Sequence, residues 1–355
     1  MRVSAGREQI EAKRAGRSNL DMSPALWALF HSNRAAWAAI KAMLDAARES
    51  IVIEQFIFSH RGIGGEILAI LAAKARQGVH VRLLADWFGS RHLADSDGAR
   101  ALIAAGGELV IFNGPGGFYR SPASAFHRLH RKSIVTDGRL LMTGGSCFHP
   151  RMEDWRDTMV LIEHPVAQDA LVEFEATWLR ATTGAVLPPP AGDRPSGERL
   201  DWSYLVSSPY ERNMQEYDFE LLERIAHAEH SVTLTSPYLV PVGRIWRVLE
   251  HATRRGVRVR VMIPARSDQP LIDIFSFRYA RRLLGRGVEV YGYTGGMMHA
   301  KLAAVDGVWS AVGSFNLGID SLRMNLEGAL VSWSRDFHDV LMERLEADLA
   351  GSRRL

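Results

Sequence analysis

Hydrophobic and polar positions repeat along the chain with two different periods, and each change of period marks a predicted element. A helical period places Trp37, Ile40 and Leu44 on one side and predicts a helix that begins at residue 32 or 33 and ends at residue 48. Another helical pattern begins just upstream, at Ser23-Pro24. Residues 51–58 are rich in β-branched and aromatic side chains, which predicts a strand.

The chain then alternates strands and helices in the order that is typical of parallel strand pairing. Helices are predicted at 62–76 and in the segment that ends at Gly106, and strands at 79–85 and 108–112. The second half of the chain repeats this order, with strands predicted at 231–235, 257–263 and 288–293 and helices at 243–255 and 272–284.

Short matching segments indicate that the repeated order is an internal duplication. Residues 77–82 (QGVHVR) correspond to residues 255–260 (RGVRVR), which indicates two copies of about 150 residues each. We therefore predict an α/β fold of two duplicated lobes, with mixed sheets flanked by helices and a pseudo-twofold axis between the lobes. The predicted divisions are a flexible N-terminus at 1–22, a first lobe at 23–180, a Pro/Gly-rich linker at 181–200 and a second lobe at 201–355.

Each predicted lobe contains the motif H-x-K-x-x-x-x-D. The first copy has His130, Lys132 and Asp137, and the second has His299, Lys301 and Asp306. A turn that starts with glycine begins fourteen residues after each histidine, at Gly144-Gly145-Ser146-Cys147 and at Gly313-Ser314-Phe315-Asn316. Each motif therefore predicts a hairpin of two strands followed by a turn, with the aspartate bracing the hairpin turn. A pseudo-twofold axis would place His130 opposite His299.

Two imidazoles and two ammonium groups around one site are suited to a phosphodiester. A neutral histidine can attack phosphorus, and a protonated one can give its proton to the leaving alkoxide. The lysines and turn donors, among them Ser146, Ser314 and Asn316, would stabilise charge on the phosphoryl oxygens. This chemistry requires no metal and no other cofactor. The alternative is that each histidine only caps its own hairpin.

These motifs resemble those of the phospholipase D superfamily, and the chain looks closest to the cardiolipin synthase branch. The resemblance extends to residues 155–158 (WRDT), 235–241 (TSPYLVP) and 325–327 (NLE). It implies that Asp157 and Glu327, 27 and 28 residues after their histidines, accept a hydrogen bond from an imidazole and fix its tautomer. Cys147 departs from the pattern, because the family usually has asparagine there, and so do Gly318 and Asp320 after the second turn.

The resemblance implies that a phosphatidyl group passes from phosphatidylglycerol to a histidine and then to an alcohol of a second lipid. We predict His130 as the nucleophile and His299 as the general acid, although the symmetry of the motifs leaves their order open. Tyr238 and the residues after the first strand, such as Glu54 and Phe56, are candidates for lining the cleft. Hydrolysis of phospholipids, a nuclease of the same superfamily and a binding module without catalysis are the alternative functions.

Composition bounds the partners and the compartment. The chain has 355 residues, a formal net charge of +3 and one cysteine, which excludes an internal disulfide. Residues 1–19 lack the apolar core of a signal peptide, and no stretch is apolar for about 20 residues, so no membrane-spanning helix is expected. We expect a cytoplasmic protein or a peripheral protein of the inner membrane. Its expected partners are an anionic phospholipid and the membrane surface, without nucleic acid or an obligatory protein partner.

One apolar segment suggests a possible contact with a membrane. Trp27, Leu29 and Phe30 lie just upstream of the first amphipathic helix and are candidates for dipping into the membrane interface. The basic residues of the chain gather into no dense run apart from the stretch between Arg244 and Arg260, which argues against a nucleic-acid groove.

Overall fold

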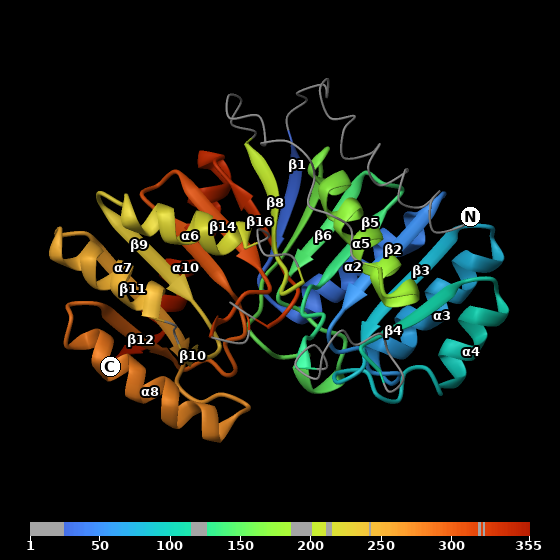
Figure 1. The fold of residues 1–355 in the computed structure, drawn as a ribbon, viewed down its shortest axis with the longest axis horizontal. Coiled ribbons are helices and arrows are strands. Elements are labelled where there is room, and N and C mark those ends of the chain that lie inside the picture. The colour runs from blue at the N-terminus through green and yellow to red at the C-terminus, as the bar shows by residue number, and fades with distance from the viewer. Residues whose placement is uncertain are drawn as a thin grey trace.

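The computed structural model describes residues 25–114, 126–185, 201–210, 215–240, 243–318, 321 and 324–355. Two mixed sheets lie side by side, each with helices packed against it (Figure 1). The predicted flexible N-terminus at 1–22 and most of the predicted linker lie outside the described residues.

The first sheet, within the described residues, has seven strands in the order β1-β7-β6-β5-β2-β3-β4. Strands β2, β3 and β4 are parallel to one another, and the other neighbours are antiparallel. The strands are β1 (Leu26–Phe30), β2 (Ser50–Gln55), β3 (His80–Asp86), β4 (Glu108–Phe112), β5 (Ser133–Thr136), β6 (Leu140–Gly144) and β7 (Met159–Glu163).

The second sheet repeats this order. Within the described residues its eight strands have the order β17-β12-β11-β9-β13-β14-β16-β8. Followed from β8, this repeats the order of the first sheet followed from β1, and β17 is an additional strand at the far edge. The strands are β8 (Trp202–Ser207), β9 (Ser231–Thr235), β11 (Arg258–Pro264), β12 (Glu289–Tyr293), β13 (Leu302–Val305), β14 (Trp309–Gly313), β16 (Glu327–Ser332) and β17 (Ser352–Arg354). Strands β10 (Leu239–Val240) and β15 (Leu317–Gly318) form a separate parallel pair.

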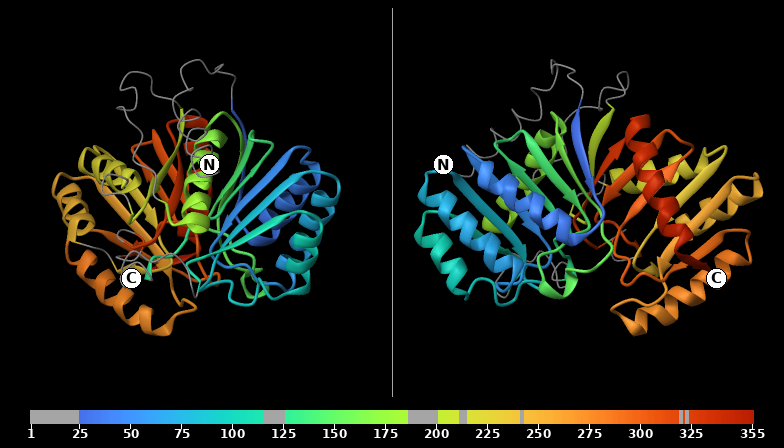
Figure 2. Two further views of the ribbon diagram at one scale, coloured as in Figure 1. Left: turned by 45° about the vertical axis from the view of Figure 1, so that its right-hand side comes forward. Right: turned by 180° about the vertical axis from the view of Figure 1, so that it is seen from behind.

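The helices cover both faces of each sheet. One face of the first sheet packs on α2 (Asn33–Ala46), α3 (Ile63–Arg76) and α4 (Asp97–Ala104), and one face of the second packs on α6 (Glu216–Ala226), α7 (Gly243–Arg254) and α8 (Pro270–Leu284). The remaining faces share a central core with α5 (Val166–Thr183) and α10 (Arg335–Ala350). These two helices lie on opposite sides of the molecule, as the view from behind shows (Figure 2).

The predicted fold class is confirmed: the protein consists of two duplicated α/β lobes with mixed sheets flanked by helices. Two isolated backbone bridges link the lobes, between Leu129 and Leu326 and between Arg156 and Met298. Leu129 is the duplicate of Met298, and Leu326 is the duplicate of Arg156. The same contact therefore occurs in both directions, as a twofold relation between the lobes requires.

The helical pattern predicted from Ser23-Pro24 is wrong. Leu26–Phe30 forms the edge strand β1, which pairs antiparallel with β7. Trp27 packs on the central core, 5.1 Å from the ring of Phe337, and Leu29 packs there too. This arrangement argues against the proposed contact of the segment with a membrane, because Trp27, Leu29 and Phe30 pack against the protein core.

The hairpins of the two motifs form as predicted, with one difference in where they start. Asp137 and Asp306 have φ angles of 51° and 52° and precede glycines that also have positive φ, which is typical of a tight two-residue hairpin turn. Strands β5 and β13 begin only at Ser133 and Leu302, so each motif's histidine and lysine lie in the extended segment just before the strand.

Candidate active site

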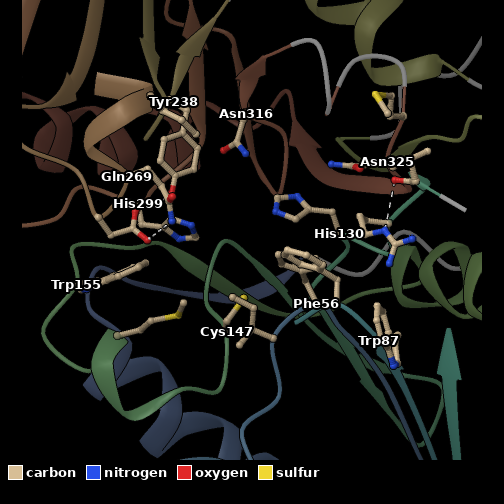
Figure 3. Close-up of a pocket in the computed structure, with 18 residues that line it drawn as sticks. Phe56, Trp87, His130, Cys147, Trp155, Tyr238, Gln269, His299, Asn316 and Asn325 are labelled. Atoms are coloured by element: carbon tan, nitrogen blue, oxygen red, sulfur yellow. Dashed lines mark hydrogen bonds between the residues drawn. The ribbon is translucent and has the colours of Figure 1, made fainter. Parts of the chain in front are cut away.

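A cavity of about 660 Å³ lies between the two lobes and holds both motif histidines. Phe56 and Trp87 enter it from the residues that follow β2 and β3, and Tyr238 from the segment that follows β9. Ligands of α/β sheets commonly bind at these carboxyl ends of parallel strands. Figure 3 shows the imidazoles of His130 and His299 approaching from opposite sides, and the predicted opposition of the two histidines is found.

His130 is held by an acid of the other lobe. Its Nδ1 lies 2.8 Å and 2.9 Å from the two carboxylate oxygens of Glu327. The backbone supports this pairing, since the N–H of His130 donates to the carbonyl oxygen of Leu326 at 2.9 Å. The N–H of Leu326 in turn donates to the carbonyl oxygen of Arg128 at 2.8 Å. The motif of the first lobe is thus fixed to strand β16 of the second.

His299 is held in the reciprocal way. Its Nδ1 lies 2.6 Å from Oδ2 of Asp157, and its N–H donates to the carbonyl oxygen of Arg156 at 2.7 Å. The second carboxylate oxygen of Asp157 accepts from the N–H of Thr158 at 2.8 Å. The side chain of Arg156 forms an ion pair with Asp348 of α10, with N···O distances of 2.5 Å and 3.2 Å. This ion pair ties the segment that carries Asp157 to the second lobe.

The two carboxylates are therefore exchanged between the histidines, relative to the pairing that their order along the sequence suggests. Counting along the chain attaches Asp157 to His130 and Glu327 to His299, but each acid reaches the histidine of the other copy. Glu327 begins β16 and Asp157 lies two residues before β7, and the twofold relation points each of these segments at the opposite lobe. Each of the two motif histidines therefore has its carboxylate partner in the opposite lobe.

Burial and charge set the protonation of these groups. Burial lowers the pKa of both imidazoles, and with the nearby Lys301 it brings that of His299 to about 4. Burial alone would raise the pKa of Asp157 and Glu327, but the partner histidines hold it below the usual carboxyl value. Ionised carboxylates only accept hydrogen bonds, so each Nδ1 carries the proton. Each Nε2 therefore has a free lone pair.

The two motif lysines lie buried beneath the histidines. The Nζ of Lys132 donates to the carbonyl oxygen of His130, and the Nζ of Lys301 donates to that of His299. Burial lowers the pKa of both, and the charge of Lys132 helps to bring the pKa of Lys301 to about 7. The two lysine side chains are thus close enough to interact, and they lie near the ionised carboxylates of Asp157 and Glu327.

The predicted turn donors divide into two groups. Asn316 lines the cavity, and its Oδ1 has no hydrogen-bond partner among the described residues. Ser146 faces away, since its Oγ accepts from Nε1 of Trp37 at 3.1 Å. Ser314 donates its hydroxyl to Glu327 and accepts from the N–H of Gly328. Ser314 thus braces a carboxylate instead of facing the cavity, and Cys147 lines the cavity where the family has asparagine.

Asp137 and Asp306 lie at the far ends of the hairpins. Asp137 accepts from the N–H groups that precede β2, at 2.7–3.1 Å, and Asp306 accepts equivalent bonds before β9, at 2.7–2.9 Å. They brace the turns, as the sequence predicted. Glu54 is also remote from the cavity, because it pairs inside the first lobe with Arg131 at 3.3 Å.

Most of the remaining cavity wall is apolar and was not identified from the sequence. It includes Trp87, Phe88, Phe126, Met152, Ile272 and Met324. Trp87-Phe88 directly follow β3, and this position at the end of a parallel strand is the signal that could have revealed them. The loop 113–124, predicted to border the site, lies mostly outside the described residues, but Phe126 and Arg128 just after it line the cavity.

Two further properties concern metals and membranes. Within the described ranges, no three His, Cys, Asp or Glu side chains are grouped as a metal site would need. In the same residues, no helix combines the length and apolarity that crossing a bilayer would need.

Comparisons with known proteins find one matching family and several relatives. The profile of the family described as "Cardiolipin synthase, PLD-like domain" matches residues 40–178 and 221–349. Cardiolipin synthase A of Pseudomonas putida is 32% identical over 335 residues, which cover 92% of this chain and 69% of the relative. Cardiolipin synthase B of Shigella flexneri is 28% identical and covers 91% of this chain and 80% of the relative.

Solved structures support the same fold at lower sequence identity. Phosphatidylserine synthase of Haemophilus influenzae superposes with a TM-score of 0.72 at 15% identity, covering all of this chain and 92% of the other. Polyphosphate kinase of Porphyromonas gingivalis gives a TM-score of 0.64 at 15% identity, covering 93% of this chain and 48% of the kinase. At these identities the two structures show the likeness of fold alone.

Proposed function

The chain belongs to the cardiolipin synthase family of phospholipase D-like proteins, and on that premise we propose that it is a phosphatidyltransferase that makes cardiolipin. The family relationship makes the chain a phospholipid-modifying enzyme. We propose phosphatidylglycerol as donor, an alcohol of a second phospholipid as acceptor, a covalent phosphohistidine as intermediate and no metal. The observation that supports this proposal best is the pair of buried histidines across one cavity, each held by a carboxylate of the other lobe.

In the proposed first step, Nε2 of His130 attacks the phosphorus of phosphatidylglycerol. The bond between phosphorus and the headgroup glycerol oxygen breaks, and that oxygen takes a proton from Nε2 of His299. The pKa of about 4 applies to His299 without a substrate anion beside it, where burial and Lys301 disfavour the protonated form. A bound anionic phosphodiester favours the protonated imidazole, so binding of the substrate prepares the acid.

In the second step the roles reverse. Neutral His299 accepts the proton of the acceptor alcohol, and the alcohol oxygen attacks the phosphorus bound to His130. The P–N bond breaks and cardiolipin leaves. His130 is assigned as nucleophile because both oxygens of Glu327 meet its Nδ1, which fixes the ring and stabilises the charge that develops on it.

Asn316 is proposed to bind the phosphoryl oxygens, and the two lysines, which do not line the cavity, are proposed to stabilise their charge from behind the histidines. The lysines supply positive charge beneath the site, and the amide of Asn316 can turn its N–H₂ toward the substrate. Cys147 offers no comparable donor in the first half. We therefore propose that the phosphoryl group lies closer to Asn316 than to Cys147.

The cavity wall favours lipid over nucleic acid. Among the described residues that line it, Arg128 is the only arginine or lysine, and it lies 3.6 Å from Asp86. A groove for nucleic acid needs a track of positive charge along the phosphates. The apolar wall also limits the access of water, which favours transfer to an alcohol over hydrolysis.

The test is incubation of the purified protein with phosphatidylglycerol vesicles in EDTA, with the lipid products identified by mass spectrometry. His130→Ala and His299→Ala are the test variants, and His92→Ala, at an exposed position, is the matched control. We expect cardiolipin and glycerol from the wild type and from the control, and loss of at least about 10³-fold in both test variants.

The other outcomes separate the alternatives. Phosphatidic acid without cardiolipin would identify a phospholipase D. Absence of lipid turnover together with chelator-resistant cleavage of DNA or RNA would replace the proposal with a nuclease. After quenching in alkaline detergent, in which a phosphohistidine is stable, ³²P retained on the protein and lost in only one histidine variant would identify the nucleophile.

A further inference from the structure

We propose that the mouth of the cavity docks on a bilayer surface that contains anionic phospholipid, through an apolar rim from both lobes and an arginine flank on α8. This inference rests on the proposed function, because it concerns how lipid reaches the site. It assigns the contact to a surface different from the segment around Trp27, whose side chain packs on the core.

The apolar rim consists of large side chains that face solvent beside the cavity. In the first lobe Phe88 and Phe126 are 55% and 68% exposed, and both also line the cavity. In the second lobe Leu271, Ile274 and Phe275 of α8 are 76%, 66% and 56% exposed. Soluble monomers rarely gather so many exposed large apolar side chains around one opening unless that surface binds something.

Helix α8 presents its solvent face in two parts. The first half carries Leu271, Ile274 and Phe275, next to Ile272, which lines the cavity. The second half exposes three arginines, Arg278, Arg281 and Arg282. All residues of α8 are described, and none of its exposed ones is acidic. Its one acid, Asp273, is half-buried and accepts from the N–H of Ser267 at 3.0 Å.

This composition fits the interface of a bilayer. Apolar side chains enter the boundary between headgroups and acyl chains, and arginines bind anionic headgroups beside them. Helix α8 lies along the outer lower edge of the second lobe in Figure 1, so the helix can lie flat on a surface. Its first turn reaches the cavity through Gln269 and Ile272. A lipid leaving the bilayer under the rim would therefore enter the site directly.

The location of the rim argues for lipid over a second copy of the chain. Phe88 and Phe126 of the rim continue into the cavity wall, and Ile272 of α8 lines the cavity beside the rest of the rim. A protein bound across the rim would cover the opening through which substrate and product must pass. A bilayer supplies the substrate through the same contact that covers the rim.

The test measures co-flotation of the protein with vesicles of phosphatidylcholine, with and without 30 mol% (about one lipid in three) phosphatidylglycerol. The rim variant is Leu271→Gln/Ile274→Gln/Phe275→Gln, and the flank variant is Arg278→Gln/Arg281→Gln/Arg282→Gln. Val308→Gln/Phe219→Gln is the matched control, because both side chains are large, apolar and exposed (47% and 58%) but lie outside α8 and do not line the cavity.

We expect the rim variant to bind both kinds of vesicle at least about 100-fold more weakly. We expect the flank variant to lose roughly 100-fold, and only on vesicles with phosphatidylglycerol. The control should bind like the wild type. Circular dichroism and thermal melting establish that each variant is folded.

Activity on monomeric dihexanoyl phosphatidylglycerol separates this inference from the proposed function. The rim variant should turn over this substrate like the wild type, because it needs no bilayer. Vesicle binding by the rim variant equal to that of the wild type would overturn the docking surface, whatever the activity. A wild-type protein that binds vesicles but turns over neither lipid would overturn the proposed function and leave the docking surface standing. A dimer that dissociates only in the rim variant, without loss of vesicle binding, would assign the rim to a second copy.

Discussion

In one half of the site His130 meets both oxygens of Glu327, whereas in the other half His299 meets a single oxygen of Asp157. The glycine-led turns that follow the two motifs differ in a corresponding way. Ser314 donates its hydroxyl to Glu327, while its duplicate Gly145 has no side chain, and a Cβ there would lie 2.1 Å from Asp157. The longer acid thus has a hydroxyl donor, and the shorter acid occupies the space that glycine leaves.

The two backbone bridges between the lobes show the same contrast. Leu326 and Arg156 are duplicates, and each forms backbone hydrogen bonds of 2.7–3.2 Å to the motif of the other lobe and to the residues just before it. Their side chains differ, since Leu326 is buried in the central core and Arg156 pairs with Asp348. The backbone pairing is the shared element of the two half-sites, and the side chains around it vary.

The largest effect should come from removing the charge of the two carboxylates. Glu327→Gln and Asp157→Asn keep the shape of the acid but offer an amide to Nδ1, which disturbs the tautomer and removes the charge that stabilises an imidazolium. We expect the kcat for cardiolipin formation to fall by about 10³-fold in each variant. Steady-state kinetics on mixed micelles measures this loss.

The comparison between the half-sites predicts that both variants lose kcat with little change in KM. Thermal melting of each variant tests that the loss is not caused by unfolding. If one of the two carboxylates were dispensable, with kcat within threefold (about 0.7 kcal/mol) of the wild type, the site would be functionally one-sided.

A smaller effect separates Asn316 from its duplicate Cys147. Asn316→Ala removes a donor that faces the cavity, and we expect a loss of about 10²-fold in kcat/KM. Cys147→Ala removes a thiol whose pKa is raised by burial and which holds no charge at neutral pH, so we expect activity within about threefold of the wild type. The same mixed-micelle assay measures both.

Exchanging the residues sharpens this prediction. Cys147→Asn should raise kcat/KM, by roughly tenfold at most, if the first half-site lacks only a donor. Equal losses for Asn316→Ala and Cys147→Ala would contradict the proposed position of the phosphoryl group.

The opposition of the two motif histidines and the order of the elements could be predicted from the sequence, because the motifs and the repeated elements depend on local patterns. The motif spacing gives the hairpins, and the turn dipeptides at Asp137 and Asp306 give their positive φ angles. The exchange of Asp157 and Glu327 could not be predicted by counting residues. It depends on how the duplicated lobes pack, and their packing depends on a core that includes Phe174 and Phe337, far apart in the sequence.

The strand at Leu26–Phe30 illustrates the other limit of the sequence pattern. Five residues are too few to separate a helical period from a strand, and the decisive factor is the open edge of β7, on which β1 pairs. The role of Ser314 was missed for a similar reason. A serine in a turn suggests a donor for substrate, whereas the structure turns its hydroxyl toward Glu327.

Replacing Arg156 by leucine, the residue at the duplicate position 326, should change the stability of the protein. Arg156→Leu leaves Asp348 without its buried ion-pair partner, and we expect the free energy of unfolding to fall by about 3 kcal/mol. Urea denaturation measures this change. Arg156→Leu/Asp348→Leu should recover most of it, because an apolar pair can replace a buried ion pair. If Arg156→Leu were as stable as the wild type, the backbone bridges alone would hold the two lobes together at this point.

The final prediction concerns the pH dependence of stability. His299 has a pKa of about 4 in the folded protein, below the ordinary histidine value of about 6.5. Between pH 6.5 and 4 the unfolded chain therefore binds a proton at this position that the folded protein does not. Stability falls as the pH falls through this window, by on the order of 3 kcal/mol from His299. Above pH 6.5 His299 is neutral in both the folded and the unfolded state, and its full contribution to stability is present.

His299→Gln should remove this part of the acid sensitivity. We expect the difference between the free energies of unfolding at pH 7 and pH 4.5 to shrink by about 2 kcal/mol, with His92→Gln at an exposed position as the control. His130→Gln tests the other half-site, where burial also lowers the pKa but both oxygens of Glu327 oppose the shift. A smaller change there than at His299 would show that the extra contact of Glu327 makes His130 the more basic imidazole, as its assignment as nucleophile requires. An equal or larger change would reverse that assignment.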